Sequence, residues 1–264
     1  MESIGTQDAY TMKTYANGLT LVPLSDAPLL LVSSRPLLTN EECGILCRNF
    51  EQGPSEEGDF LLKRVHQQID NLTGCPSHDG EAVLPRYVSY PPSQNDNPLL
   101  PDGLHVDTNN GRLFRHVTAL LYLTNNANGA TTFPLAGSKD TKLERIAQAM
   151  LDSGVTHTRA EAADNQNFRV LEQAAHDLYD GKSNVGLRVL PSMGKLCVFC
   201  NILQDGKPDP FSLHGGEAGN DEFKAVLTFF KETPLSTFTS RQEFGQKVQE
   251  SHQYLINRYF GHHR

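Results

Sequence analysis

The chain has 264 residues, a formal net charge of −8 at pH 7 and a sequence pI near 5.7. This length suffices for one large domain, and the negative charge argues against a nucleic-acid substrate, because phosphate binding needs a basic surface. No stretch is long and apolar enough for a membrane span, and the first residues lack the features of a signal peptide. The five cysteines, an odd number, are typical of a reducing compartment, so we expect a cytoplasmic protein.

The first ninety residues are predicted to form strands at both ends with two helices between them. We expect strands at 19–22, 29–32 and 82–90, and helices from residue 40 and over 60–72. Thr39 and Glu42 have the spacing of a capping box, which predicts the start of the first helix. The polar stretch 52–58 is predicted to be a loop between the helices.

A histidine and an aspartate two residues apart follow this region. In an extended strand His105 and Asp107 project from the same side, so both side chains can reach one divalent ion. Two ligands make a weak site, and His214 is a candidate for the third. Two histidines and one carboxylate form the facial triad of non-haem Fe(II) oxygenases, which leaves coordination positions open.

Strand-like segments surround these residues. Strands are predicted at 115–123, at 194–201 and over 222–231, and 129–134 is predicted to be a turn followed by a short segment that Pro134 ends. Lys224 opens the last strand and shares a face with Val226, Thr228 and Phe230. A lysine on a largely apolar face is expected to have an anionic partner if it is buried.

The segment 137–186 does not fit a simple barrel. Apolar residues at helical spacing predict helices over 139–151 and 160–179, before a strand at 186–190. This helical insertion is interpreted either as a lid that helps to shape a substrate pocket or as a plain elaboration of the domain. A capping box formed by Ser240 and Glu243 predicts a C-terminal helix that covers the barrel.

The order of these motifs resembles the 2-oxoglutarate- and Fe(II)-dependent dioxygenases of the prolyl 4-hydroxylase type, over about residues 84–232. The motifs are Tyr90, His105-x-Asp107, Arg115-x-x-Thr118-x-x-x-Tyr122-Leu123, Gly-Ala-Thr-Thr-Phe-Pro at 129–134, Gly194-x-x-x-x-Phe199, His214 and Lys224. The resemblance implies an α+β fold with a double-stranded β-helix (jelly-roll) core. N-terminal helices, the helical insertion and a C-terminal helix would surround this core within a single domain spanning 1–264.

The resemblance also implies the roles of individual residues. The catalytic iron would be ligated by His105, Asp107 and His214. Lys224 would pair with the distal carboxylate of 2-oxoglutarate, Tyr122 would hydrogen-bond the same carboxylate, and Tyr90 would line the co-substrate pocket. The implied cofactors are Fe(II), 2-oxoglutarate and O2, with ascorbate as reductant.

Two departures from the family pattern concern the substrate. The family usually has Gly-Gly-Glu-Thr where this chain has Gly-Ala-Thr-Thr at 129–132, and the spacer between Asp107 and His214 is longer than usual. Thr131 and Arg115 are candidates for substrate contacts, although Arg115 is equally suited to a structural ion pair.

The function implied is oxidation of an unactivated C–H bond in a small, amino-acid-derived molecule, with release of succinate and CO2. Both hydroxylation and oxidative cyclisation, as in the algal kainoid synthases that are similar to this family, fit this reading. A peptidyl-prolyl 4-hydroxylase is an alternative, and a jelly-roll binding protein without turnover is another. Neither a nucleic acid nor a membrane is expected as a partner.

Overall fold

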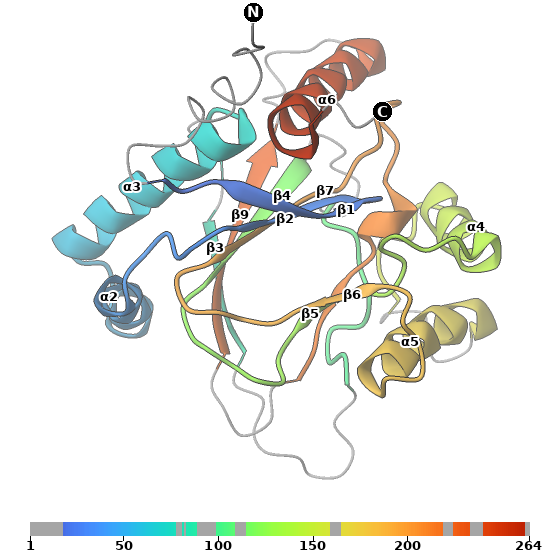
Figure 1. Ribbon diagram of the computed structural model, residues 1–264, viewed down its shortest axis with the longest axis horizontal. Coiled ribbons are helices and arrows are strands. Elements are labelled where there is room, and N and C mark those ends of the chain that lie inside the picture. The colour runs from blue at the N-terminus through green and yellow to red at the C-terminus, as the bar shows by residue number, and fades with distance from the viewer. Residues whose placement is uncertain are drawn as a thin grey trace, which may run out of the picture.

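A computed structural model of the chain describes residues 18–77, 81, 83–88, 99–108, 115–158, 165–218, 224–232 and 240–261, with the backbone alone for 83–88. Two antiparallel sheets lie between two groups of helices (Figure 1). This arrangement is the mixed helix and antiparallel-sheet architecture that the sequence predicts. Within the described part of the chain, we find no helix whose length and hydrophobicity would let it span a membrane.

The larger sheet has six strands, and every hydrogen-bonded pair of neighbours is antiparallel. In sheet order the strands are β1 (Leu21–Asp26), β2 (Leu29–Ser33), β7 (Leu196–Cys200), β4 (Arg115–Tyr122), β9 (Lys224–Glu232) and β3 (Val83–Val88). The central strands β7, β4 and β9 are buried along their whole length. They are rich in β-branched and aromatic residues, which suits a sheet that is covered on both faces.

The smaller sheet has the order β6 (Leu187–Val189), β5 (Thr131–Phe133) and β8 (Gly215–Gly216). Backbone hydrogen bonds extend it. His105 and His214 exchange both N–H···O bonds, at 2.8 and 2.9 Å. On its other side, the segment 104–106 pairs with 156–158, through Val106 N–H to Thr156 O and Thr158 N–H to Leu104 O. The helical insertion therefore adds a strand-like edge beside the segment that carries His105.

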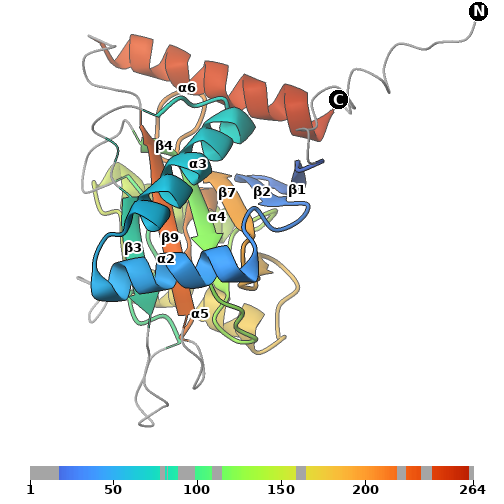
Figure 2. The same ribbon diagram turned by 90° about the vertical axis from the view of Figure 1, so that its left-hand side faces the viewer.

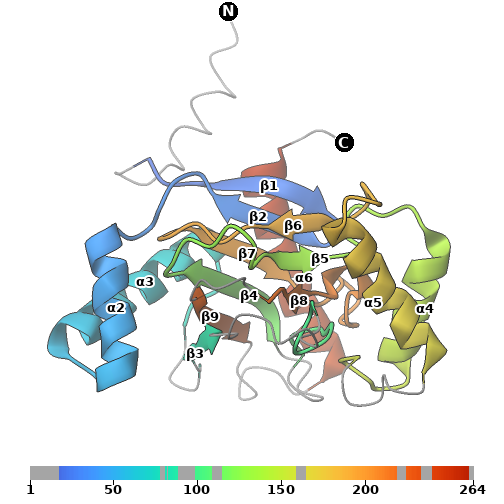
Figure 3. The same cartoon turned by 90° about the horizontal axis from the view of Figure 1, so that it is seen from below.

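Helices cover the outer faces of both sheets. α2 (Asn40–Gln52), α3 (Glu56–Thr73) and α6 (Arg241–Leu255) lie on the larger sheet (Figure 2). α4 (Thr141–Asp152) and α5 (Gln166–Tyr179) lie beside the smaller sheet (Figure 3). A π-helical turn, Ile256–Phe260, continues α6. The structure thus has four layers, with the two sheets in the middle.

The three largest apolar clusters among the described residues hold these layers together. The largest joins α2, α3 and α6 to the outer face of the larger sheet. A second lies between the two sheets and includes Tyr122, Phe133 and Phe199. A third packs α4 and α5 against Leu104, Val106 and other residues on the outer face of the smaller sheet. Because Leu104 and Val106 face outward, alternation along the strand turns His105 inward, toward the larger sheet.

Two helix starts differ from the sequence prediction. The capping box of Thr39 and Glu42 is present as predicted. However, α3 begins at Glu56 rather than near residue 60, because the Ser55 hydroxyl accepts the Gly58 N–H and three acidic residues occupy the first turn. The described part of α5 begins at Gln166 rather than 160, with Asn165 as its N-cap.

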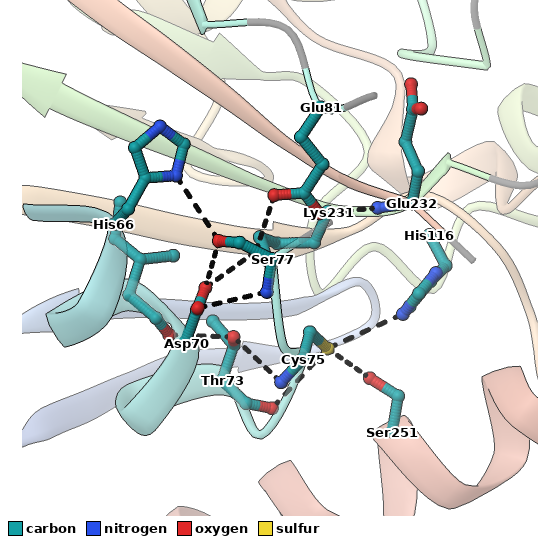
Figure 4. Close-up of polar contacts among 11 residues, drawn as sticks. His66, Asp70, Thr73, Cys75, Ser77, Glu81, His116, Lys231, Glu232 and Ser251 are labelled. Atoms are coloured by element: carbon teal, nitrogen blue, oxygen red, sulfur yellow. Dashed lines mark hydrogen bonds and ion pairs between the residues drawn. The ribbon is translucent and has the colours of Figure 1, made fainter. Parts of the chain in front are cut away.

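A buried polar cluster ties α3 to the back of β9 (Figure 4). The ammonium of Lys231, which is fully buried, donates to Asp70 Oδ1 at 2.7 Å, to Glu81 Oε2 at 2.8 Å and to Ser77 Oγ at 3.0 Å. A buried charge is tolerated when it is paired and hydrogen-bonded in this way. Lys231 faces away from the smaller sheet, and its ion pair with Asp70 holds α3 on the larger sheet.

Candidate active site

Three predicted metal ligands lie together between the two sheets. One potential donor atom from each of His105, Asp107 and His214 lies within 4.8 Å of the other two. His105 Nε2 is 3.6 Å from Asp107 Oδ1, and His214 Nε2 is 3.5 Å from Asp107 Oδ2. The reciprocal backbone hydrogen bonds between His105 and His214 place their side chains on one face of the smaller sheet.

Neighbouring groups orient these side chains. His214 Nδ1 lies 2.9 Å from the Ser212 carbonyl oxygen, which leaves Nε2 directed at the other two ligands. The Thr118 hydroxyl donates to Asp107 Oδ2 at 2.9 Å. Two imidazole nitrogens and one carboxylate oxygen that converge in this way match the donor set that ferrous oxygenases use. The residues present therefore fit one Fe(II) ion.

A pocket opens at this group of side chains and takes its walls from both sheets. Its lining consists of Asp102, His105, Asp107, Thr131, His214 and Gly216 on the side of the smaller sheet, and of Leu120, Lys224, Val226, Thr228 and Phe230 from the larger sheet. The three metal-ligating residues and Lys224 therefore face the same space.

Lys224 brings a positive charge into this pocket. Its side chain is only 3% exposed, and burial lowers the pKa of its ammonium group to about 8, while the charge of Glu217 acts in the opposite direction. Among the described residues the ammonium forms no hydrogen bond or ion pair. A buried cation of this kind favours an anionic guest, because leaving it unpaired is costly.

Two glycines make room for the lysine. A Cβ atom on Gly129 would lie 3.1 Å from Lys224 Cδ, and one on Gly216 would lie 3.8 Å from Lys224 Nζ. A side chain at either position would crowd the lysine or the space in front of its ammonium group. The glycines thus keep the charged end of the pocket open.

Tyr122 lies behind the pocket wall rather than in it. Its hydroxyl is 2.9 Å from Thr131 Oγ1, and Thr131 lines the pocket. Burial raises the pKa of the Tyr122 phenol well above its ordinary value, so the hydroxyl keeps its proton. If Tyr122 hydrogen-bonds the distal carboxylate of 2-oxoglutarate, as predicted, that carboxylate lies next to Thr131. Tyr90 lies outside the described residues.

Arg115 is engaged in an ion pair. Its Nε donates to Glu232 Oε1 at 2.5 Å, and its guanidinium lies over the ring of Phe230, 3.8 Å from the ring centre. Phe230 lines the pocket, whereas Arg115 does not. The structure therefore places Arg115 behind an aromatic wall residue.

Sequence patterns did not reveal a second buried ion pair near the pocket. Glu217 is fully buried and accepts two hydrogen bonds of 2.6 Å from Arg188, and the Thr132 hydroxyl donates to it as well. Arg188 in turn lies over the ring of Tyr179 of α5. Glu217 directly follows Gly216, which lines the pocket. The two-fold hydrogen bond from Arg188 therefore holds the end of β8 in place.

His157 was also missed, although it continues the row of histidines. It forms an antiparallel bridge with His105 on the side opposite His214, and residues paired in this way have side chains on the same face. The imidazole Nδ1 of His157 is buried, and no described residue forms a hydrogen bond with it. The signal available in the sequence was only a histidine inside the predicted insertion.

Comparison with known proteins adds a sequence relative. No family model matches the chain. It is 29% identical over 166 residues to prolyl 4-hydroxylase 2 of Arabidopsis thaliana, a match that covers 61% of this chain and 44% of the relative. The chain thus spans less than half the length of the curated relative it matches.

Solved structures give weaker similarities. A viral collagen prolyl hydroxylase from Paramecium bursaria Chlorella virus-1, in its 2OG complex, is 13% identical with a TM-score of 0.40, covering 78% of this chain and 97% of that one. An N-substituted L-amino acid dioxygenase from Burkholderia ambifaria is 14% identical with the same TM-score, covering 78% and 84%. At these TM-scores the structural similarities carry no weight of their own. By its sequence match and its His105–Asp107–His214 group, the chain is similar to the prolyl 4-hydroxylases, and the three side chains fit the metal group of 2-oxoglutarate- and Fe(II)-dependent dioxygenases.

Proposed function

We propose that the protein oxidises an unactivated C–H bond of a small, amino-acid-derived molecule, using Fe(II), 2-oxoglutarate and O2 and releasing succinate and CO2. His105, Asp107 and His214 would hold the iron, and Lys224 would bind the distal carboxylate of 2-oxoglutarate. We also infer that the two facing sheets form a double-stranded β-helix with the pocket between them.

The observation that carries the proposal is the ammonium group of Lys224. It is buried in the same pocket as the three convergent ligands and forms no ion pair with any of the residues described, although the charge of Glu217 acts on it from a distance. A dicarboxylate held by the metal at one end would supply an anionic partner at the other. A metal site with a structural role would not need a buried cation beside it.

The bound iron and co-substrate would supply the oxidising chemistry, and the protein would position the groups around them. Lys224 would fix one end of the co-substrate, and Thr131, supported by Tyr122, would line the wall beside it. Leu120, Val226 and Phe230 would limit the access of water to the pocket. The pose of the substrate between these walls would decide between hydroxylation and ring closure.

Peptidyl-prolyl 4-hydroxylation is the second candidate, favoured by the match to the Arabidopsis prolyl 4-hydroxylase. The small-molecule proposal rests on the pocket beside the three ligands, whose walls come from both sheets. The insertion lies next to it, because its segment 156–158 pairs with the segment that carries His105, but none of the described residues of the insertion lines the pocket itself. In either case Arg115 would act on substrate only through Phe230.

Substrate-dependent formation of succinate tests both candidates. The protein would be incubated with Fe(II), ascorbate, 2-oxoglutarate and one substrate at a time, chosen from free and N-alkylated amino acids and from proline-rich peptides, and the product identified by mass spectrometry. Turnover of an amino-acid derivative supports the first candidate, and turnover of a peptide supports the second. Tight binding of metal and 2-oxoglutarate without turnover of any substrate would instead indicate a non-catalytic binding protein.

A further inference from the structure

The acidic ligand of the metal group is held from the opposite sheet. Asp107 follows the segment 104–106, which extends the smaller sheet, while Thr118 lies in the middle of β4 in the larger sheet. The Thr118 hydroxyl is fully buried and lies 2.9 Å from Asp107 Oδ2. The other oxygen of the carboxylate, Oδ1, is the one that lies 3.6 Å from His105 Nε2.

A second side chain fixes the direction of this hydrogen bond. Asn201 Nδ2 lies 2.8 Å from Thr118 Oγ1, and an amide nitrogen can only donate. The Thr118 oxygen therefore accepts from Asn201, and its single proton is free to point at Asp107. An ionised carboxylate only accepts hydrogen bonds, so the chain from Asn201 through Thr118 to Asp107 has one consistent direction.

Asn201 is rigidly placed for this purpose. It is fully buried, its backbone N–H donates to His116 O at 2.9 Å, and its backbone carbonyl accepts from the Asp209 N–H at 2.8 Å. Its side-chain Oδ1 is buried and has no hydrogen-bond partner among the described residues. A buried polar atom without a partner is unfavourable. The presence of an amide at this position is therefore better explained by the hydrogen bond that its nitrogen donates to Thr118 than by packing.

We propose that Thr118 and Asn201 are positioning residues for the metal, which together hold the carboxylate of Asp107 in its orientation toward the two imidazoles. This inference rests on the proposed function. Thr118 engages Oδ2, which lies 3.5 Å from His214 Nε2, while Oδ1 lies 3.6 Å from His105 Nε2. A carboxylate fixed in this way is ready to ligate an ion between the two histidines, whereas a carboxylate that can rotate must first be ordered.

Binding of Mn(II), a redox-stable substitute for Fe(II), to the metal-free protein tests the inference. Thr118→Val removes the hydroxyl at nearly constant volume, and Asn201→Asp replaces the donor by an acceptor that competes for the Thr118 proton. We expect each change to weaken Mn(II) binding by roughly 10–100-fold, the range typical of groups that orient metal ligands. Thr118→Ser, which keeps the hydroxyl, should bind Mn(II) nearly as tightly as the wild type.

A matched control separates this role from general loss of stability. Thr73→Val removes another fully buried threonine hydroxyl, one that donates to Ile69 O within α3, and should leave Mn(II) affinity unchanged. Affinities would be compared by calorimetry at a temperature where circular dichroism shows each variant to be folded. If Thr118→Val does not fold, Asn201→Asp carries the test.

The possible results separate this inference from the proposed function. If the wild type binds Mn(II) and both Thr118→Val and Asn201→Asp bind it equally well, the inference is wrong and the proposed function stands. If Thr118→Ser is as weak as Thr118→Val, the hydroxyl is not the important group and the inference fails. If the wild type binds no more Mn(II) than a His214→Ala variant, the proposed metal site fails and the inference fails with it.

Discussion

Replacing Lys224 by methionine removes the buried charge from the pocket while it keeps most of the length and volume of the side chain. The ordinary pKa of 10.5 is lowered to about 8 by burial. At 1.36 kcal/mol for each pH unit, this difference corresponds to about 3 kcal/mol of unfavourable free energy for the charged lysine at neutral pH. We therefore expect Lys224→Met to stabilise the protein in the absence of ligand, by up to that amount.

The same change should weaken binding of 2-oxoglutarate. A hydrogen bond to a charged group contributes about 1.5–3 kcal/mol, which corresponds to a roughly 10- to 150-fold increase in Kd. Calorimetric titration of the Mn(II)-loaded protein with 2-oxoglutarate measures this Kd, and Mn(II) affinity itself should not change. Denaturation by urea without metal measures the stability.

The pH dependence supplies a second signature. Because the folded-state pKa of Lys224 is below its unfolded value, the unfolded chain binds more protons between about pH 8 and 10.5. The stability contribution from this residue therefore rises with pH across that window, and it should be absent in Lys224→Met. Over the same range the wild type should lose affinity for 2-oxoglutarate, because the ammonium group loses its proton.

Lys231 is the matched control, since it is a buried lysine on the same strand. It faces the other way and is paired with Asp70 and Glu81. Lys231→Met should cost about 3–5 kcal/mol of stability, as expected when one partner of a buried pair is removed, and should leave 2-oxoglutarate affinity unchanged. The reasoning is refuted if Lys224→Met binds 2-oxoglutarate as tightly as the wild type, or if it is the more destabilised of the two variants.

Three further outcomes follow from the structure. Arg188→Leu leaves the buried carboxylate of Glu217 without its partner and should destabilise the protein toward the lower end of about 3–5 kcal/mol in urea denaturation, with most of the loss recovered when Glu217→Gln is added. Burial raises the pKa of Asp209 to about 7, so the folded state binds more protons than the unfolded chain and the Asp209 contribution to stability should fall as the pH rises from about 4 to about 7. Asp209→Asn should remove that dependence. If the difference in unfolding free energy between the wild type and Asp209→Asn does not change with pH, the raised pKa of Asp209 is wrong. Mn(II) should raise the melting temperature of the wild type but not that of His214→Ala, whereas equal stabilisation of both would show that the metal binds elsewhere.

The sequence predicts local features of this fold well, because they depend on residues close together in the chain. The capping box at Thr39 and Glu42 is an example, and its hydrogen bonds are present in the structure. The start of α3 at Glu56 was missed because the polar residues after Ser55 were interpreted as a loop rather than as a cap and first turn.

Contacts between distant segments could not be predicted in the same way. Thr118 and Asn201 are 83 positions apart, and Arg188 and Glu217 are 29 apart, so each pairing depends on the register of strands within or between the sheets. His105, Asp107 and His214 were selected by residue chemistry and by the family resemblance, since no local periodicity joins position 214 to the other two. His157 had neither signal, because its pairing with His105 appears only when the insertion is placed on the sheet.

The pairing of 156–158 with 104–106 has a consequence for engineering the chain. A shortened version that joins residue 140 directly to 180 removes the two peripheral helices α4 and α5. It would also strip the backbone partners of Leu104 and Val106 and uncover an apolar strand edge that can recruit another chain. Minimal variants of this protein should therefore keep that tripeptide in place, even if α4 and α5 are redesigned around it.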